Sequence, residues 1–346
     1  MRRERRPILS LTGVALMFLL FAVSSGLAAS PTPIQLTYAT MWPSNHPYSV
    51  GDQRWIEWVE KETKGAIKIK PYWGGTLVSA KESMTEATSG VADIVCISPI
   101  YEKAGVDMTR AQTGFYQGSQ SGAVQLKIFR SLWDKFPELR NEYKNMKIIA
   151  LSAVTSLRLM SKTPVRSLPD LKGMRIKTGK ELIAPLKHYG AEGVIIPSVE
   201  TYETLQKGII NAAFQQAQYY KAAKLAEVVK YDINLTSVMG PFPNKAMSLK
   251  SWNKLPKEIQ KIFEDSGDKW TLFMLEEIEK TDKDAFDMAR QAGIVFIELP
   301  PSEIHDFNVL TDQEALKSAK ELDAKGLPGT KMFQEVKRLI KEYSKK

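Results

Sequence analysis

Two basic residues stand on one face of a short stretch that has the alternation of a β-strand. In residues 174–177, apolar side chains alternate with Arg175 and Lys177. Because successive side chains of a strand point to opposite faces, both cations lie on the same face. A carboxylate that leaves water needs a charge-assisted partner, which arginine offers as a two-pronged fork and lysine as a point charge. The pair predicts recognition of an anion, and a solvated strand edge is the alternative.

A third cation, Arg158, lies alone between apolar neighbours in residues 156–160. We therefore expect Arg158 to be a further candidate for contact with an anion.

The residue types that build metal sites and catalytic centres are sparse. The chain has three histidines and one cysteine, with no paired cysteines, no His-x-x-x-His and no acidic loop of the calcium-binding type. It also has no Gly-x-Ser-x-Gly elbow, phosphate-binding loop or dinucleotide fingerprint. Cys96 can form no intramolecular disulfide, and its apolar neighbours indicate a buried thiol. We expect no catalytic residues, no metal site and no cofactor.

Several segments, in order, resemble one known family. Residues 167–177, Ser-Leu-Pro-Asp-Leu-Lys-Gly-Met-Arg-Ile-Lys, are similar to the signature of substrate-binding proteins of tripartite ATP-independent periplasmic (TRAP) transporters, of the dicarboxylate-binding type. Further likenesses lie at 90–93, 190–191, 200–208 and 252–256. Each piece alone is weak, but the ordered set covers most of the mature chain and is specific.

The resemblance implies a fold and a partner. It implies an α/β protein of two lobes, with hinge strands, a long bracing helix and closure around a small organic acid. The first lobe is expected to comprise residues 29–154 plus about 242–282, and the second residues 155–241 plus about 283–346. The ligand would be passed to integral membrane subunits that are driven by an ion gradient.

The resemblance also implies ligand-binding residues. The family normally has an arginine in the place of Lys177, where it grips the substrate carboxylate with two prongs. Lysine keeps the positive charge, and Arg158 or Arg175 could supply the two-pronged contact with the ligand carboxylate. Gln215 stands where the family uses an amide on the ligand. By position the pocket would also include Ser98, Tyr101, Ser198, Trp42, His46 and Trp73. Plain packing is the alternative for the aromatic residues, Tyr219 included, and a turn role is the alternative for His46.

The pattern of elements independently predicts an α/β fold. Strands are expected at 35–39, 66–70, 93–98, 174–177, 194–196, 211–214 and 294–299, with helices between them. Residues 88–93 and 206–211 both end a helix at glycine and then enter a strand at Asp or Asn. This echo predicts duplicated lobes, and a chance recurrence of a common junction is the alternative. From 256 to about 290 the pattern is helical throughout, and 35 residues would reach roughly 50 Å, enough to brace both lobes. A kinked pair of helices is the alternative.

The N-terminus has the pattern of a secretory signal peptide. Four arginines within residues 2–6 precede the apolar run 14–23 and a stretch of small residues. We expect residues 1–28 to be removed by cleavage after Ala28. A retained anchor is the alternative, but spanning a bilayer takes roughly 20 apolar residues. The pair Arg5-Arg6 leaves a twin-arginine export route open. The cleavage site has no cysteine, so we expect no lipid anchor attached to an N-terminal cysteine.

Composition places the mature chain among ordinary globular proteins. The 346 residues are 43% hydrophobic and 25% charged. Loss of the signal peptide removes four arginines and Glu4, so the formal charge falls from +9 to +6. Without basic runs, an exported protein of this charge is not expected to bind nucleic acid. We predict a periplasmic solute-binding protein. The alternatives are a ligand-binding protein that feeds a membrane sensor and an exported enzyme.

Overall fold

Two sheets organise the chain in the computed structural model, which describes residues 32–119, 121–152 and 156–343. The expected signal peptide and its cleavage site lie outside these ranges. The first sheet has the strand order β2-β1-β3-β10-β4 and the second the order β11-β9-β5-β8-β6-β7. The strands of the first sheet are β1 Ile34–Ala39, β2 Ile67–Tyr72, β3 Ile94–Cys96, β4 Met146–Ser152 and β10 Phe242–Ser248. Those of the second are β5 Leu157–Ser161, β6 Arg175–Lys177, β7 Glu192–Val194, β8 Ala212–Gln215, β9 Tyr231–Ser237 and β11 Val295–Ile297.

The two sheets are built alike. In the first, β1 runs parallel to β2 and β3, and β10 is antiparallel to β3 and β4. In the second, β6 runs parallel to β7 and β8, and β5 is antiparallel to β8 and β9. The antiparallel strand in each sheet comes directly after a strand of the other sheet along the chain. The predicted α/β class with two lobes is confirmed.

The two glycine junctions noted in the sequence occupy corresponding places. Gly90 and Gly208 have φ of 77° and 70°, the left-handed region that glycine enters at little cost, and they precede β3 and β8. Asp93 then accepts a hydrogen bond from the backbone N–H of Thr37 in β1 at 2.7 Å. Asn211 does the same for Arg175 in β6, also at 2.7 Å. The same side-chain bond thus links the start of β3 to β1 in the first sheet and the start of β8 to β6 in the second.

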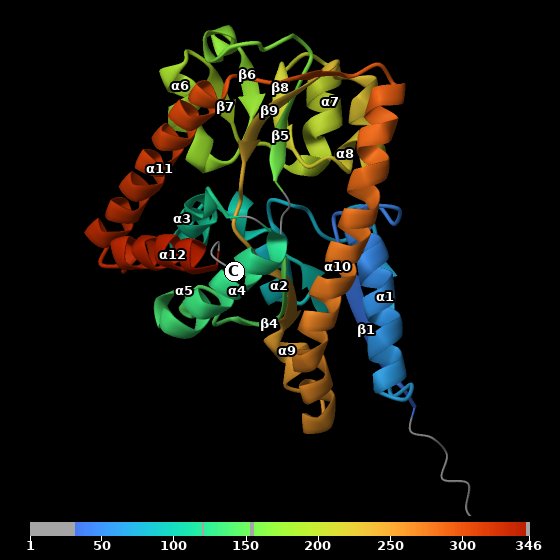
Figure 1. Ribbon diagram of the computed structural model, residues 1–346. Coiled ribbons are helices and arrows are strands. Elements are labelled where there is room, and N and C mark those ends of the chain that lie inside the picture. The colour runs from blue at the N-terminus through green and yellow to red at the C-terminus, as the bar shows by residue number, and fades with distance from the viewer. Residues whose placement is uncertain (1–31, 120, 153–155, 344–346) are drawn as a thin grey trace, which may run out of the picture. The chain divides into compact units, whose positions relative to one another are not determined.

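One long helix contacts elements of both sheets. Helix α10 runs without a break over Lys257–Gln291, as the sequence predicts, and lies beside α1, Pro47–Glu62 (Figure 1). It also contacts β4 and the short helix α8, Tyr219–Ala222. Two glycines allow its close approach, because a Cβ at Gly267 would lie 2.0 Å from the carbonyl oxygen of Ile149. A Cβ at Gly51 would lie 3.1 Å from Cα of Met274.

The C-terminal helix packs against elements from distant parts of the chain. Helix α11 covers Pro301–Ala324 and α12 covers Gly329–Tyr343. Met332 and Val336 of α12 share an apolar cluster with Phe129 of helix α4, Gly122–Lys135. The same cluster contains Ala315 and Ala319 of α11, so α12 packs against both α4 and α11. The apolar stripe of α12 decides its position, and a linear division of the sequence cannot show which surface that stripe meets.

Some predicted boundaries shift for local reasons. The strand expected at 194–196 ends at Val194, because its partner β6 ends at Lys177, which pairs with Val194. The helix expected from about residue 79 begins at Ser83, since Ser79 donates its backbone N–H to the Glu86 carboxylate at 2.9 Å. The remaining helices are α2 Ser83–Ser89, α3 Asp107–Gln112, α5 Pro137–Asn141, α6 Ile183–His188, α7 Thr201–Gln206 and α9 Leu249–Trp252.

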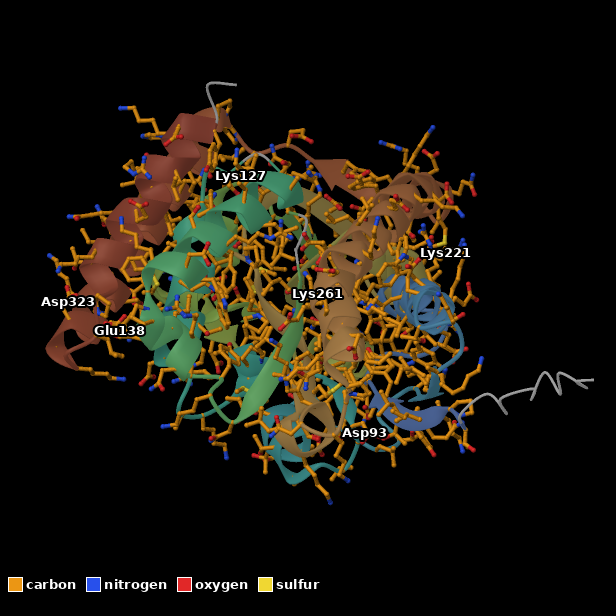
Figure 2. All side chains as sticks on the ribbon, turned by 90° about the horizontal axis from the view of Figure 1, so that it is seen from below. Asp93, Lys127, Glu138, Lys221, Lys261 and Asp323 are labelled. Atoms are coloured by element: carbon orange, nitrogen blue, oxygen red, sulfur yellow. The ribbon has the colours of Figure 1, made fainter. Side chains whose placement is uncertain are left out.

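Charged side chains cover the outside of the described chain. Lys127, Lys221 and Asp323 are exposed and lie at the periphery of the view in Figure 2. Within the described ranges, no helix combines the length and apolar character that crossing a membrane requires.

Candidate ligand-binding site

A cavity of about 660 Å³ lies where strands of both sheets end. Trp42 follows β1, Ser98 follows β3, Thr178 follows β6 and Gln215 ends β8, and all four line the cavity. The carboxyl ends of parallel strands in open α/β sheets are where such folds commonly bind ligands. The position of the cavity therefore follows from the topology of the two sheets.

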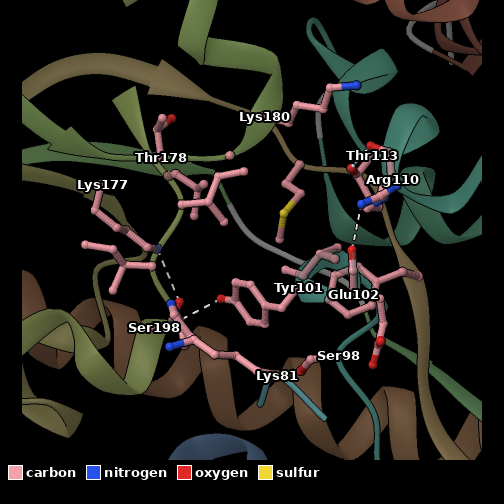
Figure 3. Close-up of a pocket in the computed structure, with 18 of the residues that line it drawn as sticks. Lys81, Ser98, Tyr101, Glu102, Arg110, Thr113, Lys177, Thr178, Lys180 and Ser198 are labelled. Carbon is pink, nitrogen blue, oxygen red and sulfur yellow. Dashed lines mark hydrogen bonds between the residues drawn. The ribbon is translucent and has the colours of Figure 1, made fainter. Parts of the chain in front are cut away.

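Lys177 supplies a buried positive charge in the cavity wall. Its side chain is 7% exposed, and Nζ donates a hydrogen bond to Oγ of Ser198 at 3.2 Å (Figure 3). Nζ also donates to the carbonyl oxygen of Phe214 at 3.3 Å. Burial lowers the pKa of Lys177 to about 8, and the nearby carboxylate of Glu181 partly opposes this shift. An ammonium group has three donors, so both hydrogen bonds leave one N–H for a further acceptor.

Ser198 joins Lys177 to the opposite wall. Ser198 begins a short 3-10 turn, Ser198–Glu200, and its backbone N–H donates to the hydroxyl oxygen of Tyr101 at 3.2 Å (Figure 3). Tyr101 belongs to the turn Pro99–Tyr101 that follows β3 of the first sheet. Lys81, also from the first part of the chain, forms an ion pair with Glu200 at 3.0 Å. The turn at 198–200 thus contacts both the cavity cation and the facing elements.

Aromatic rings form another part of the wall. Trp42 is 7% exposed and packs edge-to-face against Tyr48 and Tyr219, with ring centroids 5.3 and 6.3 Å away. All three rings line the cavity. Among the described residues no group accepts a hydrogen bond from Nε1 of Trp42. The wall therefore suits a ligand with an apolar or aromatic body.

The comparison with known proteins decides the family. Residues 38–321, most of the chain, match the model of the bacterial extracellular solute-binding proteins, family 7, also called DctP. The chain belongs to that family. It is a class of solute-binding proteins, not of enzymes, and the predicted family is confirmed.

Curated relatives and solved structures agree with this assignment. A solute-binding protein of Albidiferax ferrireducens is 26% identical over 315 residues, which cover 84% of this chain and 91% of that protein. A TRAP periplasmic solute-binding protein from Desulfovibrio salexigens is 27% identical with a TM-score of 0.73, covering 90% of this chain and 96% of that one. A TRAP solute-binding protein from Rhodoferax ferrireducens, complexed with copurified benzoate, shares the fold at 17% identity. Its TM-score is 0.81, over 90% of this chain and 99% of that one.

Six of the nine residues that the sequence suggested line the cavity of this solute-binding protein. They are Lys177, Gln215, Tyr101, Ser98, Ser198 and Trp42. Gln215 is 1% exposed, and its Nε2 donates to Oγ1 of Thr201 at 2.9 Å. Ser98 donates its backbone N–H to Oγ of Ser83 at 2.9 Å, which fixes the loop after β3. Contact of these residues with a ligand stays a prediction.

Arg158 and Arg175 lie outside the cavity lining. This corrects the expectation that either guanidinium contacts a ligand carboxylate in the cavity. Nε of Arg158 lies 2.5 Å from Oδ1 of Asp232, which is fully buried, and the guanidinium lies over the ring of Phe286. Arg175 pairs with Glu192 at 2.9 Å on the exposed side of the sheet. Each arginine has a carboxylate partner within the fold, and neither is among the residues that line the cavity.

Two of the suggested aromatic residues also lie outside the cavity lining. His46 is 2% exposed and stacks on Trp42 with centroids 4.4 Å apart. It also caps α1, because its Nδ1 accepts the backbone N–H of Tyr48 at 3.2 Å. Trp73 packs edge-to-face against Tyr38 at 6.0 Å. His46 therefore supports the ring wall from behind, and Trp73 belongs to the packing around β1.

Sequence reasoning missed several cavity residues. Glu181 follows the Lys177 strand by four residues, so the rule that ligands bind at strand ends could have identified it. Tyr48 lies in the first turn of α1, directly after the loop that holds Trp42 and His46. Asn244, 4% exposed, comes from β10, and no local pattern marks it. Its Nδ2 donates to the carbonyl oxygen of Ile97 at 3.3 Å, a contact across 147 residues that only folding creates.

The described part of the chain holds no group of three or more His, Cys, Asp or Glu side chains that could bind a metal ion. Cys96 is buried, and burial raises its thiol pKa to about 11. A thiol in this state is a poor nucleophile.

Proposed function

We propose that this solute-binding protein captures a small organic carboxylate in the periplasm and passes it unchanged to the membrane subunits of a TRAP transporter. The observation that carries the proposal is the buried ammonium group of Lys177 in the cavity wall. Its hydrogen-bond acceptors among the described residues, Ser198 and the Phe214 carbonyl, are both neutral. A carboxylate in the cavity would supply a hydrogen-bonded counter-charge in addition to the nearby Glu181.

The electrostatics of Lys177 support an anionic ligand. A pKa lowered from 10.5 to about 8 corresponds to roughly 3 kcal/mol against the charged form. An anion within hydrogen-bonding distance would offset this cost, since an opposite charge favours the ammonium form. The buried charge thus makes the empty site unfavourable and the occupied site favourable.

Known relatives bind ligands of this class. A periplasmic protein of Nostoc, 23% identical over 298 residues, is a monocarboxylate 2-oxoacid-binding protein. Proteins of the same fold were solved with benzoate, D-glucuronate or orotic acid. All these ligands carry a carboxylate on a small organic body, which agrees with a cation beside an aromatic wall.

We propose that ligand binding favours a closed form of the protein. Tyr101 and Ser198 meet across the cavity, as do Lys81 and Glu200. A ligand held by Lys177 on one side and by Trp42 on the other would contact both facing walls. Such a ligand has more contacts in the closed form and shifts the population towards it.

Thermal-shift screening of organic acids, with mass spectrometry of compounds that copurify, would identify the ligand. Calorimetry should then show that Lys177→Met weakens its binding at least about tenfold, or about 1.4 kcal/mol. Arg175→Gln is the matched control, because it removes a cation two residues away that lies outside the cavity. An unchanged dissociation constant in Lys177→Met would refute the role of Lys177.

Delivery and the lack of turnover need separate tests. If the neighbouring genes encode a small and a large integral membrane subunit, vesicles that contain these subunits should take up the ligand only when the binding protein is added. The compound recovered from the protein after long incubation should be chemically unchanged. Product formation would favour an exported enzyme, and uptake that does not need the protein would favour a sensory role.

A further inference from the structure

Glu181 is a buried carboxyl group in the cavity wall. It lies in the 3-10 turn Lys180–Leu182 that follows β6, and its side chain is 8% exposed. Burial raises the pKa of Glu181, while its own backbone N–H and Lys177 oppose this shift. Among the described residues no group donates a hydrogen bond to its Oε1. A buried acceptor without a donor costs about 1–3 kcal/mol, so its retention needs an explanation.

Two glycines make the recess that Glu181 occupies. A Cβ at Gly179 would lie 2.3 Å from Oε1 of Glu181, and a Cβ at Gly114 would lie 2.7 Å from Cβ of Glu181. Gly179 has φ −80° and ψ 166°, which any residue can adopt. Glycine is therefore needed at position 179 for space and not for backbone conformation. The absence of a side chain at Gly179 and Gly114 leaves the space that the Glu181 side chain occupies in the cavity wall.

The charges of Lys177 and Glu181 together select among organic acids. A ligand carboxylate at Lys177 lies near the negative charge of Glu181, which acts on Lys177 electrostatically. A second carboxylate directed at Glu181 would be repelled, whereas a hydroxyl or an ammonium group would find an acceptor. A buried acceptor discriminates strongly, because a ligand without a donor leaves it unpaired.

We propose that Glu181 determines specificity by accepting a hydrogen bond from the ligand, so that the ligand is a monocarboxylate that also carries a hydroxyl or ammonium group. This inference rests on the proposed function, since it places the ligand carboxylate at Lys177. It goes beyond that function by excluding plain monocarboxylates, and dicarboxylates with the second acid group at Glu181, as preferred ligands.

Matched ligand pairs test the proposal. Calorimetry at pH 7 would compare benzoate with 3-hydroxybenzoate, phenylacetate with mandelate, and 3-phenylpropionate with phenylalanine. In the wild type the substituted acid should bind at least about tenfold more tightly in one or more pairs. The ratio of the two affinities in that pair should fall to about threefold or less in Glu181→Gln. The acid without the extra donor should bind this variant as well as it binds the wild type, or better. The pair with the preference shows whether the donor is a hydroxyl or an ammonium group.

Two further variants separate recognition from a structural role. Gly179→Ala keeps the charge but displaces the carboxylate, so it should also lower the ratio. Glu192→Gln makes the same chemical change on the exposed side of the sheet and should leave the ratio unchanged. Melting temperatures of all variants would report any loss of stability.

Several outcomes would overturn the proposal. The proposal is wrong if the affinity ratio persists in Glu181→Gln or if that variant weakens both acids equally. It is also wrong if the wild type shows no preference in any pair. Failure of the proposed function looks different: no acid of any pair binds the wild type, and Lys177→Met has no effect on any bound compound.

Discussion

Oδ1 of Asp52 lies 2.8 Å from Nζ of Lys245 in the core beneath the first sheet, where both side chains are at most 1% exposed. Asp52 also accepts hydrogen bonds from the hydroxyl of Tyr38 at 2.6 Å and from Nε1 of Trp270 at 2.5 Å. The ammonium lies over the rings of Tyr38, Trp55 and Trp270 at 3.9, 4.5 and 5.0 Å. The pair joins α1 and β10, and the ring contacts extend it to β1 and α10.

Breaking this pair should destabilise the protein strongly. Either Asp52→Asn or Lys245→Met leaves one uncompensated buried charge, so each should lower the free energy of unfolding by about 3–5 kcal/mol. The double variant removes both charges and should lose less than the sum of the two single changes. Urea unfolding followed by tryptophan fluorescence would measure all three.

An exposed pair on α10 provides the control. Lys261, labelled in Figure 2, and Asp265 form an ion pair at 2.6 Å with more than half of each side chain exposed. Lys261→Met should leave the free energy of unfolding nearly unchanged, because solvent screens an exposed pair. If Lys245→Met cost no more than this control, the buried pair would not stabilise the core.

Ligand affinity should depend on pH through Lys177. Its pKa of about 8 means that the ammonium form, which attracts a carboxylate, predominates below pH 8 and is lost as pH rises through that value. The dissociation constant should therefore increase between pH 7 and 9.5, approaching tenfold per pH unit at the alkaline end, or about 1.4 kcal/mol. Calorimetry across this range would measure it.

Lys177→Arg separates this effect from general alkaline damage. A guanidinium stays charged at every pH tested, so this variant should bind with nearly constant affinity. A flat profile in the wild type, or an identical slope in both proteins, would contradict the assignment.

Acid stability should depend on His46. Burial lowers its pKa from 6.5 to about 3, so between these values the unfolded chain takes up a proton that the folded protein does not. Stability should therefore fall as pH drops below 6.5, by about 1.4 kcal/mol per pH unit below about 5.5. His46→Asn retains a side-chain oxygen for the cap of α1 and does not titrate, so its stability curve should be flatter.

Thermal unfolding between pH 7 and 4 would compare the two proteins. His305→Asn is the control, because that side chain is exposed on α11. The idea fails if His46→Asn keeps the wild-type slope.

Closure of the cavity should depend on the ion pair between Lys81 and Glu200. Lys81 and Glu200 pair at 3.0 Å with 60% and 44% of their side chains exposed, so the pair is worth about 1 kcal/mol or less. Lys81→Glu places like charges together and should weaken ligand binding about threefold at low salt. Adding Glu200→Lys should restore affinity, and high salt should reduce both effects. Calorimetry at two salt concentrations would show this; equal affinities in all variants would rule out a contribution to closure.

The sequence by itself determined the elements and the chief cation. Local periodicity and glycine caps are properties of neighbouring residues, so the parallel strands, the long helix α10 and the junctions at Gly90 and Gly208 could be predicted. The same reasoning, with the family resemblance, pointed to Lys177 because the end of a strand and its inward face can be read from six or seven consecutive residues.

Only the tertiary structure decided which polar groups face the cavity. Arg158 looked as suitable as Lys177, but its partner Asp232 lies 74 residues away, and no local pattern shows that they meet. Glu181 occupies a recess that depends on Gly114, 67 residues away, as well as on its neighbour Gly179. Lys245 is paired with Asp52, 193 residues away. Burial and pairing depend on contacts between distant segments. The charge of a residue is therefore visible in the sequence, whereas its availability to a ligand is settled by folding.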